Sequence, residues 1–169
     1  MKSKTAQESL SITTEIVLPN DTNNLNNLMG GRLLHWMDIA TAIAAHRHCG
    51  RIVVTAAVNN VSFSKAIPAG SIVTLEAKVT RAFTSSMEVI VDVWMENNQH
   101  KGKVKCNEAI YTFVAVDGLG KPVQVPDLVP ETELEKKRYT AALRRRQLSL
   151  VLAGKMSPKD ATELKALFD

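Results

Sequence analysis

The chain has 169 residues, of which 45% are hydrophobic, 22% charged and 5% aromatic, a composition typical of a single globular domain. It contains no uninterrupted run of about 18 apolar residues, and its first residues, MKSKTAQES, lack the apolar segment of a secretory signal. We therefore expect no membrane insertion, no export and a cytoplasmic location. Two cysteines, Cys49 and Cys106, are too few for a disulfide framework and lack zinc-ligand spacing, so we expect core residues and no metal.

The net charge of +4 is concentrated near the C-terminus. Residues 1–129 carry 12 Lys and Arg against 11 Asp and Glu, whereas residues 130–169 carry 9 against 6. Because no aromatic residues are interleaved with the arginine run 144–146, the pattern favours a solvated helix face and no nucleic-acid partner. Binding of a polyanion or of an acidic partner is the alternative.

The first half of the chain predicts one strand, one loop and one long helix. Residues 11–18 (SITTEIVL) predict a short strand, and the Asn- and Asp-rich residues 19–27 predict an irregular loop. The segment from Gly30 to Gly50 lacks proline and ends at a glycine, as helices often do. Its apolar residues lie on more than one side, so we expect the helix to be buried on most sides.

Strand-like segments occupy most of the chain between this helix and residue 116. They are residues 52–63, 72–83, 87–96 and 103–116, and apolar and polar residues alternate clearly in the second and third of them. Their number and spacing indicate an antiparallel sheet. We therefore expect an α+β fold in which the sheet curls around the helix, with a strand order that the sequence leaves open.

The C-terminal region predicts helices. Residues 131–147 have Glu early and Arg late, which suits the helix dipole, and indicate an exposed helix. Residues 157–169 predict a shorter helix capped by Ser157. We expect one domain over residues 1–129 and a helical extension over residues 130–169.

Asp38 is the most unusual residue of the long helix, because it has apolar neighbours along the chain and on its own face. An ionised carboxylate is rarely buried without a partner. One interpretation is an acid at the helix edge, solvated or paired with Arg32 or a strand lysine. The other is a partly desolvated carboxylate that acts as a base or a nucleophile.

Other candidate residues lie around the helix. Gly30 and Gly31 would allow close approach to backbone amides at the helix start, which can bind an oxyanion. Asn23 could hydrogen-bond a substrate or water, although asparagines also shape turns. The remaining polar candidates, interpreted as surface or cap residues, are His35, His46 and His48.

Several segments together resemble the acyl-CoA thioesterases of the hotdog fold. They are DTNNLNNLMGGRLLHWMD (residues 21–38), the stretch AAHRHCGRIVVTAAVNNVSFSKAIPAGSIVTLEAKV, TSSMEVIVDV and YTFVAVDGLGKPVQVP, and the resemblance covers roughly residues 12–126. In that fold an antiparallel sheet wraps around a long central helix. Two features differ: Asn26 stands where relatives generally have Gly, and Met29 where they frequently have His or Phe.

The resemblance implies hydrolysis of fatty acyl-CoA to free acid and CoA without a metal or another cofactor. It places the catalytic aspartate at Asp38 and the catalytic asparagine at Asn23, contributed by opposite subunits of a homodimer. It also implies assembly of dimers into a hexamer, a trimer of dimers. A thioester carbonyl would face the amides of Gly30 or Gly31.

The same resemblance implies a set of substrate contacts. The pantetheine arm is expected along the strand edge and the 84–87 segment, and the CoA phosphates near basic side chains. The residues are Val54, Thr55, Ser85, Ser86, Met87, Arg81 and Lys65. A non-catalytic hotdog protein that senses acyl-CoA is the alternative function. A hotdog dehydratase fits less well, because the helix lacks the His and acid arrangement of that branch.

Overall fold

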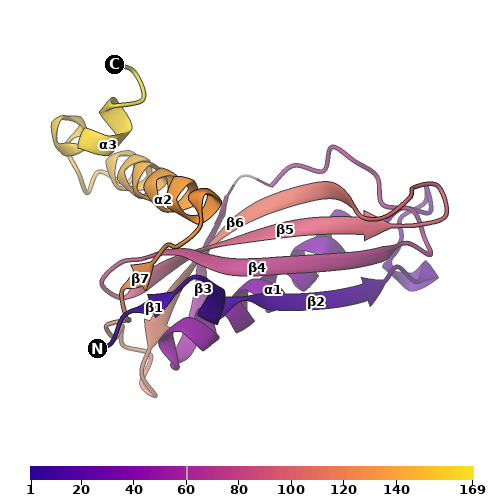
Figure 1. Ribbon diagram of the computed structural model, residues 1–169, viewed down its shortest axis with the longest axis horizontal. Coiled ribbons are helices and arrows are strands. Elements are labelled where there is room, and N and C mark those ends of the chain that lie inside the picture. Colours follow the sequence, from indigo (N-terminus) through magenta and orange to yellow (C-terminus); the bar gives the residue numbers. More distant parts are fainter. Residues whose placement is uncertain (60) are drawn as a thin grey trace.

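The computed structural model describes residues 1–59 and 61–169, and its main element is a curved antiparallel sheet around one helix (Figure 1). The strand order is β2-β4-β5-β6-β3. The strands are β2 (Ser11–Ile16), β3 (Ile52–Asn59), β4 (Ile72–Ala82), β5 (Ser86–Glu96) and β6 (Val104–Val116). Helix α1 (Gly30–Cys49) lies in the concave side of the sheet. The α+β fold that the sequence and the resemblance imply is confirmed.

The core lies between α1 and the inner face of the sheet. In β4, Val73, Leu75, Ala77 and Val79 are all fully buried, as their alternation with polar residues predicts. In the paired strand β5, the corresponding inward residues are Met87, Val89, Val91 and Val93. A sheet with one apolar face therefore holds the helix by burial of apolar area.

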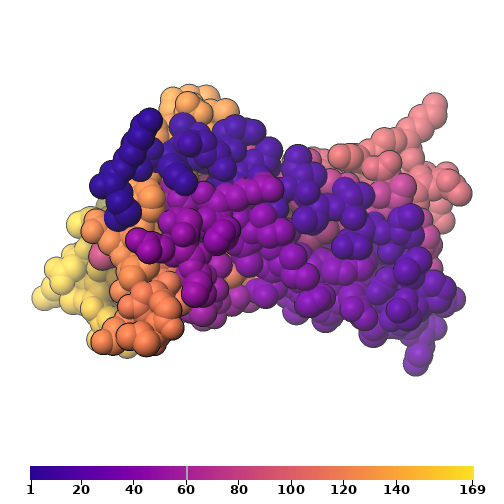
Figure 2. Space-filling model, turned by 90° about the horizontal axis from the view of Figure 1, so that it is seen from below, coloured from indigo at the N-terminus to yellow at the C-terminus, as the bar shows by residue number. Residues whose placement is uncertain are grey.

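Helix α1 is buried on one side only, which corrects the expectation of burial on most sides. Leu33, Met37, Ala40 and Ala44 pack against the sheet, whereas Ile39 is 45% exposed. In the view of Figure 2, the segment coloured purple, which includes α1, reaches the surface without a covering layer. The second apolar side of the helix therefore has no partner within the described part of one protomer.

Helix α2 (Glu133–Leu152) has only three buried residues, in line with the expectation of an exposed helix, but one of its sides lies against the outer face of the sheet. Many of the outward residues of β4 and β5 are polar, and three of these polar residues form ion pairs with α2. These pairs are Lys78 with Glu135, Asp92 with Arg138, and Glu88 with Arg145. Arg138 and Arg145 each bind their carboxylate with two hydrogen bonds. Part of the basic C-terminal charge is thus neutralised within the fold.

The helix α2 begins with a capping box. The hydroxyl of Thr132 accepts a hydrogen bond from the amide of Glu135, and the Glu135 carboxylate accepts one from the amide of Thr132. The same carboxylate accepts a hydrogen bond from Lys78. One side chain therefore both starts the helix and attaches it to the sheet.

Short elements complete the chain. They are β1 (Lys4–Thr5), which pairs in parallel with β7 (Leu128–Val129), the 3-10 turns η1 (Gln7–Ser9), η2 (Pro19–Asp21) and η3 (Pro158–Asp160), and helix α3 (Thr162–Lys165). Ser157 caps η3, as expected of it, but the single helix expected over 157–169 is shorter and divided. Pro158 can begin such a turn but cannot donate a backbone hydrogen bond within a longer helix.

His48 is fully buried, so the interpretation of it as a surface residue is wrong. It lies in the last turn of α1, and its Nε2 lies 2.7 Å from the carbonyl oxygen of Pro126. Burial lowers the pKa of His48, an effect that the Pro126 carbonyl partly opposes. Cys106 is buried, as expected, and Cys49 is partly buried.

Candidate active site

Asp38 lies on the side of α1 that the sheet leaves open. Its carboxylate is half-buried, and its Oδ1 accepts a hydrogen bond of 2.8 Å from the Thr55 hydroxyl. Arg32, a possible partner from the sequence, instead pairs with Asp21 at 3.1 Å. Within residues 1–59 and 61–169, no Lys or Arg forms an ion pair with Asp38. The interpretation of Asp38 as a paired surface acid is therefore not supported.

A β-bulge aims Thr55 at this carboxylate. Thr55 pairs with Phe113 of β6, but Ala57 pairs with the next residue, Thr112, so Ala56 is the extra residue. Without a bulge, residues 55 and 57 would point to the same face of the sheet. With it, Thr55 faces inward to Asp38, while Ala57 borders a groove on the outer face.

Asp38 is the acidic residue of an open, mostly apolar depression of about 520 Å³. Gly31, Leu34 and His35 come from the same face of α1, one or two turns before Asp38. The other lining residues are Val58, Val61, Phe63 and Tyr111. The depression can accept an apolar chain and places one carboxylate beside it.

Tyr111 lies at the floor of the depression. Its hydroxyl donates a hydrogen bond of 3.1 Å to the backbone carbonyl of Leu34, and its ring stacks on Phe113 at 6.2 Å. Burial raises the pKa of Tyr111 to about 12, and the charge of Asp38 adds to the increase. The hydroxyl therefore stays protonated at neutral pH and holds the turn of α1 that precedes Asp38.

The start of α1 has free backbone donors. Met29, at the N-cap, makes no side-chain capping bond, and in the described residues the amides of Gly30 and Gly31 have no hydrogen-bond acceptor. A side chain at Gly30 would meet the ring of Phe63 at 3.2 Å, whereas the space beside Gly31 is open. The amides of this first turn are thus available to a ligand in the depression, as the sequence suggests.

Strand β3 is shorter than expected. The predicted strand 52–63 ends at Asn59, and residue 60 lies outside the described residues. Residues 61–63 leave the sheet, and Phe63 packs over Gly30. The end of the predicted strand therefore forms one wall of the depression.

Asn23 is exposed in the loop before α1 and does not line the depression of its own protomer. Its Oδ1 accepts hydrogen bonds from the amides of Leu25 and Asn27, at 2.9 and 3.3 Å, which makes it a turn-forming residue. Asn26 in the same loop has φ of +58°, a conformation that favours glycine and that asparagine tolerates better than most residues. Asparagine at this position is therefore compatible with the loop that a glycine would form.

The remaining candidates are spread over both faces of the sheet. Val54 is exposed on the free edge strand β3, Ser85 and Ser86 lie at the β4–β5 turn, and Met87 is buried in the core. Lys65 donates a hydrogen bond to the carbonyl of Lys105, away from the depression. Arg81 lies on the outer face against α2, where its guanidinium stacks on Tyr139 at 4.0 Å. Their assignment to substrate binding stays a prediction.

The two lining residues with polar side chains besides Asp38, His35 and Tyr111, are not among the site residues that the sequence predicts, and neither are the apolar ones. His35 lies three residues before Asp38, so helical spacing alone places it on the same face and could have indicated it. Tyr111 comes from a distant strand, and nothing in its local sequence connects it with Asp38.

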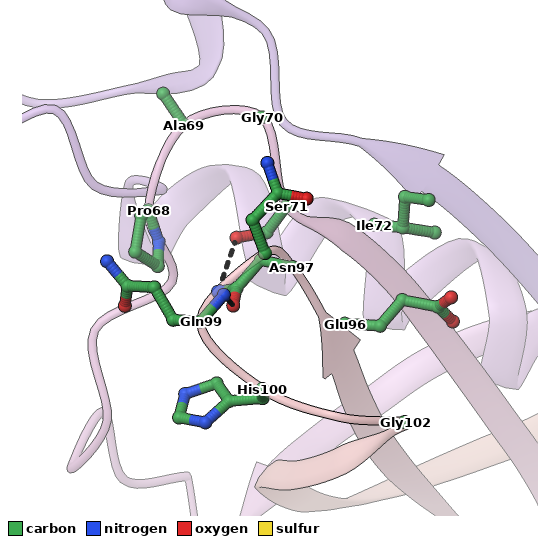
Figure 3. A pocket seen from close by; sticks show the side chains of 11 residues that line it. Pro68, Ala69, Gly70, Ser71, Ile72, Glu96, Asn97, Gln99, His100 and Gly102 are labelled. Atoms are coloured by element: carbon green, nitrogen blue, oxygen red, sulfur yellow. Dashed lines mark hydrogen bonds between the residues drawn. The ribbon is translucent and has the colours of Figure 1, made fainter.

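A second hollow, of about 450 Å³, lies where β4 begins and β5 ends, and it has a different character (Figure 3). It lies between the segment 68–72 and the segment 96–102, and a hydrogen bond of 3.4 Å links Asn97 to Ser71 across it. Its lining is rich in amides and contains neither Asp38 nor any other residue of the depression. We therefore place the candidate site at Asp38.

Two features are absent from the described residues. No group of three or more His, Cys, Asp or Glu side chains among them is arranged to hold a metal ion. In that same part of the chain, each helix is too short or too polar to cross a membrane.

Known proteins of one family resemble this chain. The family model of the thioesterase superfamily matches residues 25–100. The uncharacterized acyl-CoA thioester hydrolase YkhA of Bacillus subtilis is 44% identical over 139 residues, which cover 82% of this chain and 81% of YkhA. A hexameric acyl-CoA thioesterase of known structure has a TM-score of 0.86 and 37% identity, and the match covers 90% of this chain and 98% of that one.

An acyl-CoA hydrolase from Staphylococcus aureus has been solved in complex with butyryl-CoA, CoA and CoA disulfide. Its TM-score is 0.82 at 35% identity, with 90% of this chain and 95% of that chain covered. Structures of the same enzyme exist with alanine in place of an asparagine, an aspartate and a threonine. In its sequence the aspartate follows the asparagine by 15 residues, and the threonine follows the aspartate by 17. Because YkhA is 44% identical to this chain over most of both sequences, the chain belongs to the acyl-CoA thioester hydrolases of the thioesterase superfamily.

Proposed function

We propose that this protein hydrolyses fatty acyl-CoA to the free fatty acid and CoA. The observation that carries the proposal is a carboxylate, Asp38, in an apolar depression that extends to Gly31 in the first turn of α1, with one oxygen held by Thr55. Membership of the acyl-CoA thioester hydrolases supports the same reaction. The reaction then depends on the amides at the start of α1, on Asp38, and on Asn23 from the partner subunit.

The thioester carbonyl is placed against the amides of Gly30 or Gly31. These donors and the positive end of the α1 dipole stabilise the negative charge that develops on the carbonyl oxygen. The acyl chain would lie along the apolar wall that Leu34, Val58 and Phe63 provide. This arrangement puts the carbonyl carbon within the same depression as Asp38.

Asp38 acts in one of two ways. As a general base it takes a proton from water, the resulting hydroxide adds to the carbonyl carbon, and the CoA thiolate leaves with the proton. As a nucleophile it attacks the carbonyl directly, expels the thiolate and forms an anhydride that water then hydrolyses. Because Thr55 occupies Oδ1, Oδ2 is the oxygen that is free for either role.

Asn23 is proposed to act in the site of the partner subunit, where its amide would hold the water or the carbonyl. The spacing from Asn23 to Asp38 and from Asp38 to Thr55 equals that of the three residues replaced by alanine in the S. aureus enzyme. This agreement supports the assignment of all three residues to one site.

Assembly as a homodimer, and of dimers into a hexamer, is part of the proposal. Strand β3 is an unpaired edge, and its Ile52, Val54 and Val58 are exposed together with Ile39 of α1. An apolar edge strand of this kind invites pairing with a second chain. The hexameric relative supports the larger assembly. We further propose a cytoplasmic location and a reaction that needs no metal or other cofactor.

The test is release of CoA thiol from a series of short to long acyl-CoAs, palmitoyl-CoA included, measured with a thiol reagent. We expect turnover by the protein and a loss of kcat of at least about 100-fold in Asp38→Asn, since an activated water or nucleophile is lost. Asn23→Ala and Thr55→Val should each lower kcat less. Glu15→Gln, on the exposed side of β2, is the matched control and should leave turnover unchanged.

The assignment of the site is wrong if Asp38→Ala and Asn23→Ala both retain full activity. Tight acyl-CoA binding without any turnover would instead indicate the sensor function. The two results are distinguishable on one preparation, because binding is measured by calorimetry and turnover by thiol release.

A further inference from the structure

A groove of about 160 Å³ lies on the outer face of the sheet, directly behind the strand that carries Thr55. Its floor is a row of residues that are neighbours in the sheet: Glu88 of β5 pairs with Thr112 of β6, and Thr112 pairs with Ala57 of β3. Its roof is the C-terminal half of α2. The other lining residues are Ala56, Asn59, Phe83, Ala142, Arg145, Arg146 and Ser149.

The charge of this groove is positive. The carboxylate of Glu88 is buried and accepts hydrogen bonds from Arg145 Nε and Nη2, at 2.9 and 2.8 Å, and from the Thr80 hydroxyl. That pairing neutralises Glu88 and fixes Arg145. Arg146, by contrast, forms no ion pair with any residue of 1–59 or 61–169.

Arg146 is held in place without a carboxylate. Its guanidinium lies 5.3 Å from the centre of the Phe83 ring, and Arg81 approaches the same ring at 5.9 Å. Stacking of this kind orients a guanidinium while leaving its N–H donors free for an oxyanion. An oriented arginine with uncommitted donors is suited to phosphate.

The bulge at Ala56 connects the groove with the candidate active site. On one side of β3, Thr55 binds Asp38, and on the other side Ala57 lines the groove. The two sites are thus separated by the thickness of one strand, and Phe83 lies beside the β4–β5 turn at the end of the same groove. At the end of β3, Val58 lines the depression and Asn59 lines the groove, so a flexible arm that passes the end of this strand can join the two without crossing the edge that pairs with a second chain.

We propose that the groove binds a phosphate of the nucleotide end of acyl-CoA, with Arg146 as its main ligand. The inference rests on the proposed function, because it names the place of one part of that substrate. Ser149 and Asn59 can add neutral hydrogen bonds from the two walls. The volume is below that of a pocket for a whole ligand, so it holds a phosphate and the adjoining sugar rather than the complete nucleotide.

The experiment compares three substrates with the same acyl group: acyl-CoA, its 3′-dephospho form and acyl-pantetheine, which has no nucleotide. For Arg146→Gln we expect the KM of acyl-CoA to rise about tenfold with little change in kcat, since one charged hydrogen-bonding group is lost. The KM of acyl-pantetheine should stay unchanged. Arg146→Lys keeps the charge but not the planar fork and should restore part of the affinity. Lys137→Gln, on the exposed side of α2, is the matched control.

The dephospho substrate identifies the phosphate. If Arg146→Gln no longer affects KM for that substrate, the 3′-phosphate is the group bound; if the effect persists, it is the diphosphate. The inference is wrong if Arg146→Gln leaves the KM of acyl-CoA unchanged, or if it raises the KM of acyl-pantetheine to the same extent.

Binding of CoA alone, measured by calorimetry, separates this inference from the proposed function. If neither acyl-CoA nor acyl-pantetheine is hydrolysed, the proposed function fails. Weaker CoA binding by Arg146→Gln than by Lys137→Gln would still support the groove as a phosphate site, and equal binding by the two variants would overturn it.

Discussion

The two long helices of this protein have the same length but are held by different forces. Helices α1 and α2 each span 20 residues. Eight residues of α1 are buried, most of them apolar: Leu33, Trp36, Met37, Ala40, Thr41, Ala44, Ala45 and His48. Only three residues of α2 are buried, namely Glu135, Ala142 and Gln147. Helix α2 is attached to the outer face of the sheet largely by ion pairs, beside the buried Ile90 of β5.

This difference matches what each helix is proposed to do. Attachment by apolar burial does not depend on pH or salt in the ordinary range, so Asp38 is held on a rigid element. Attachment by ion pairs depends on both, and it leaves side chains such as Arg146 at the surface, where a charged ligand can reach them. Asp38 is thus on a helix held by apolar burial, whereas Arg146 is on a helix whose attachment depends on pH and salt.

The largest stability effect is expected for the core residue beside Asp38. Met37 is fully buried between α1 and the sheet. Met37→Ala removes apolar contacts and leaves a cavity, so we expect a loss of about 2–5 kcal/mol in the free energy of unfolding. Urea denaturation followed by circular dichroism measures it.

The matched change on the other helix is Leu134→Ala. Leu134 is 57% exposed on α2, and we expect a loss of less than about 0.5 kcal/mol. Equal losses for Met37→Ala and Leu134→Ala would contradict the distinction between the two helices.

The second prediction concerns the ion pair beneath α2 that has the most buried carboxylate. Arg145→Met leaves the carboxylate of Glu88, whose side chain is only 6% exposed, without its charged partner. We expect a loss of about 2–3 kcal/mol in the free energy of unfolding, less than for a fully buried pair because Arg145 is partly exposed. Urea denaturation at neutral pH measures it.

A double variant decides whether the pair itself or the unpaired charge is responsible. In Glu88→Leu combined with Arg145→Met, both charges are replaced by apolar groups, and much of the lost stability should return. If the double variant is as unstable as Arg145→Met alone, the loss comes from packing of the arginine stem and not from the buried carboxylate.

The third prediction is the pH dependence of the α2 attachment. Burial tends to raise the pKa of Asp92, but the hydrogen bonds and charges of Arg138 and Lys105 outweigh it and hold the pKa below its ordinary value of 3.8. The stabilisation is therefore complete above that value and is lost as the pH falls through the lower pKa of the folded state.

Arg138→Gln tests this dependence. We expect the variant to be about 1–2 kcal/mol less stable than the parent at pH 7, with the difference shrinking as the pH falls below about 4. Urea denaturation of both proteins over a pH series measures it. A difference that stays constant to low pH would show that Asp92 is not the group involved.

The same contrast explains which parts of the structure were predictable from the sequence. The inner face of the sheet and the helix against it could be predicted from local patterns. The alternation in β4 reflects contact with one large core, and the lack of proline in α1 favours a continuous helix. Asp38 was noticeable because an acid among apolar residues breaks that pattern. What remained open was the strand order, since it depends on pairings between distant segments.

The contacts on the outer face of the sheet could largely not be predicted, because they too join distant segments of the chain. Arg138 and Asp92 are 46 residues apart, and Arg145 and Glu88 are 57 apart, so nothing in the arginine run itself indicates its partners. The bulge at Ala56, which turns Thr55 toward Asp38, is set by its register with β6. The burial of His48 depends on a loop 78 residues later in the chain.

A smaller effect than at the ion pairs is expected at the capping box of α2. Thr132→Ala removes the acceptor for the Glu135 amide, and an N-cap change of this type costs about 1 kcal/mol. Because Glu135 also pairs with Lys78, fraying of the first turn should weaken the attachment of α2 to β4 as well. The effects of Thr132→Ala and Lys78→Gln on the free energy of unfolding should therefore not add, since both act through the same carboxylate. Thr132→Ser keeps the cap and serves as the control. If the two losses add fully, the cap and the ion pair are independent, and α2 is held at its start by something other than the shared carboxylate of Glu135.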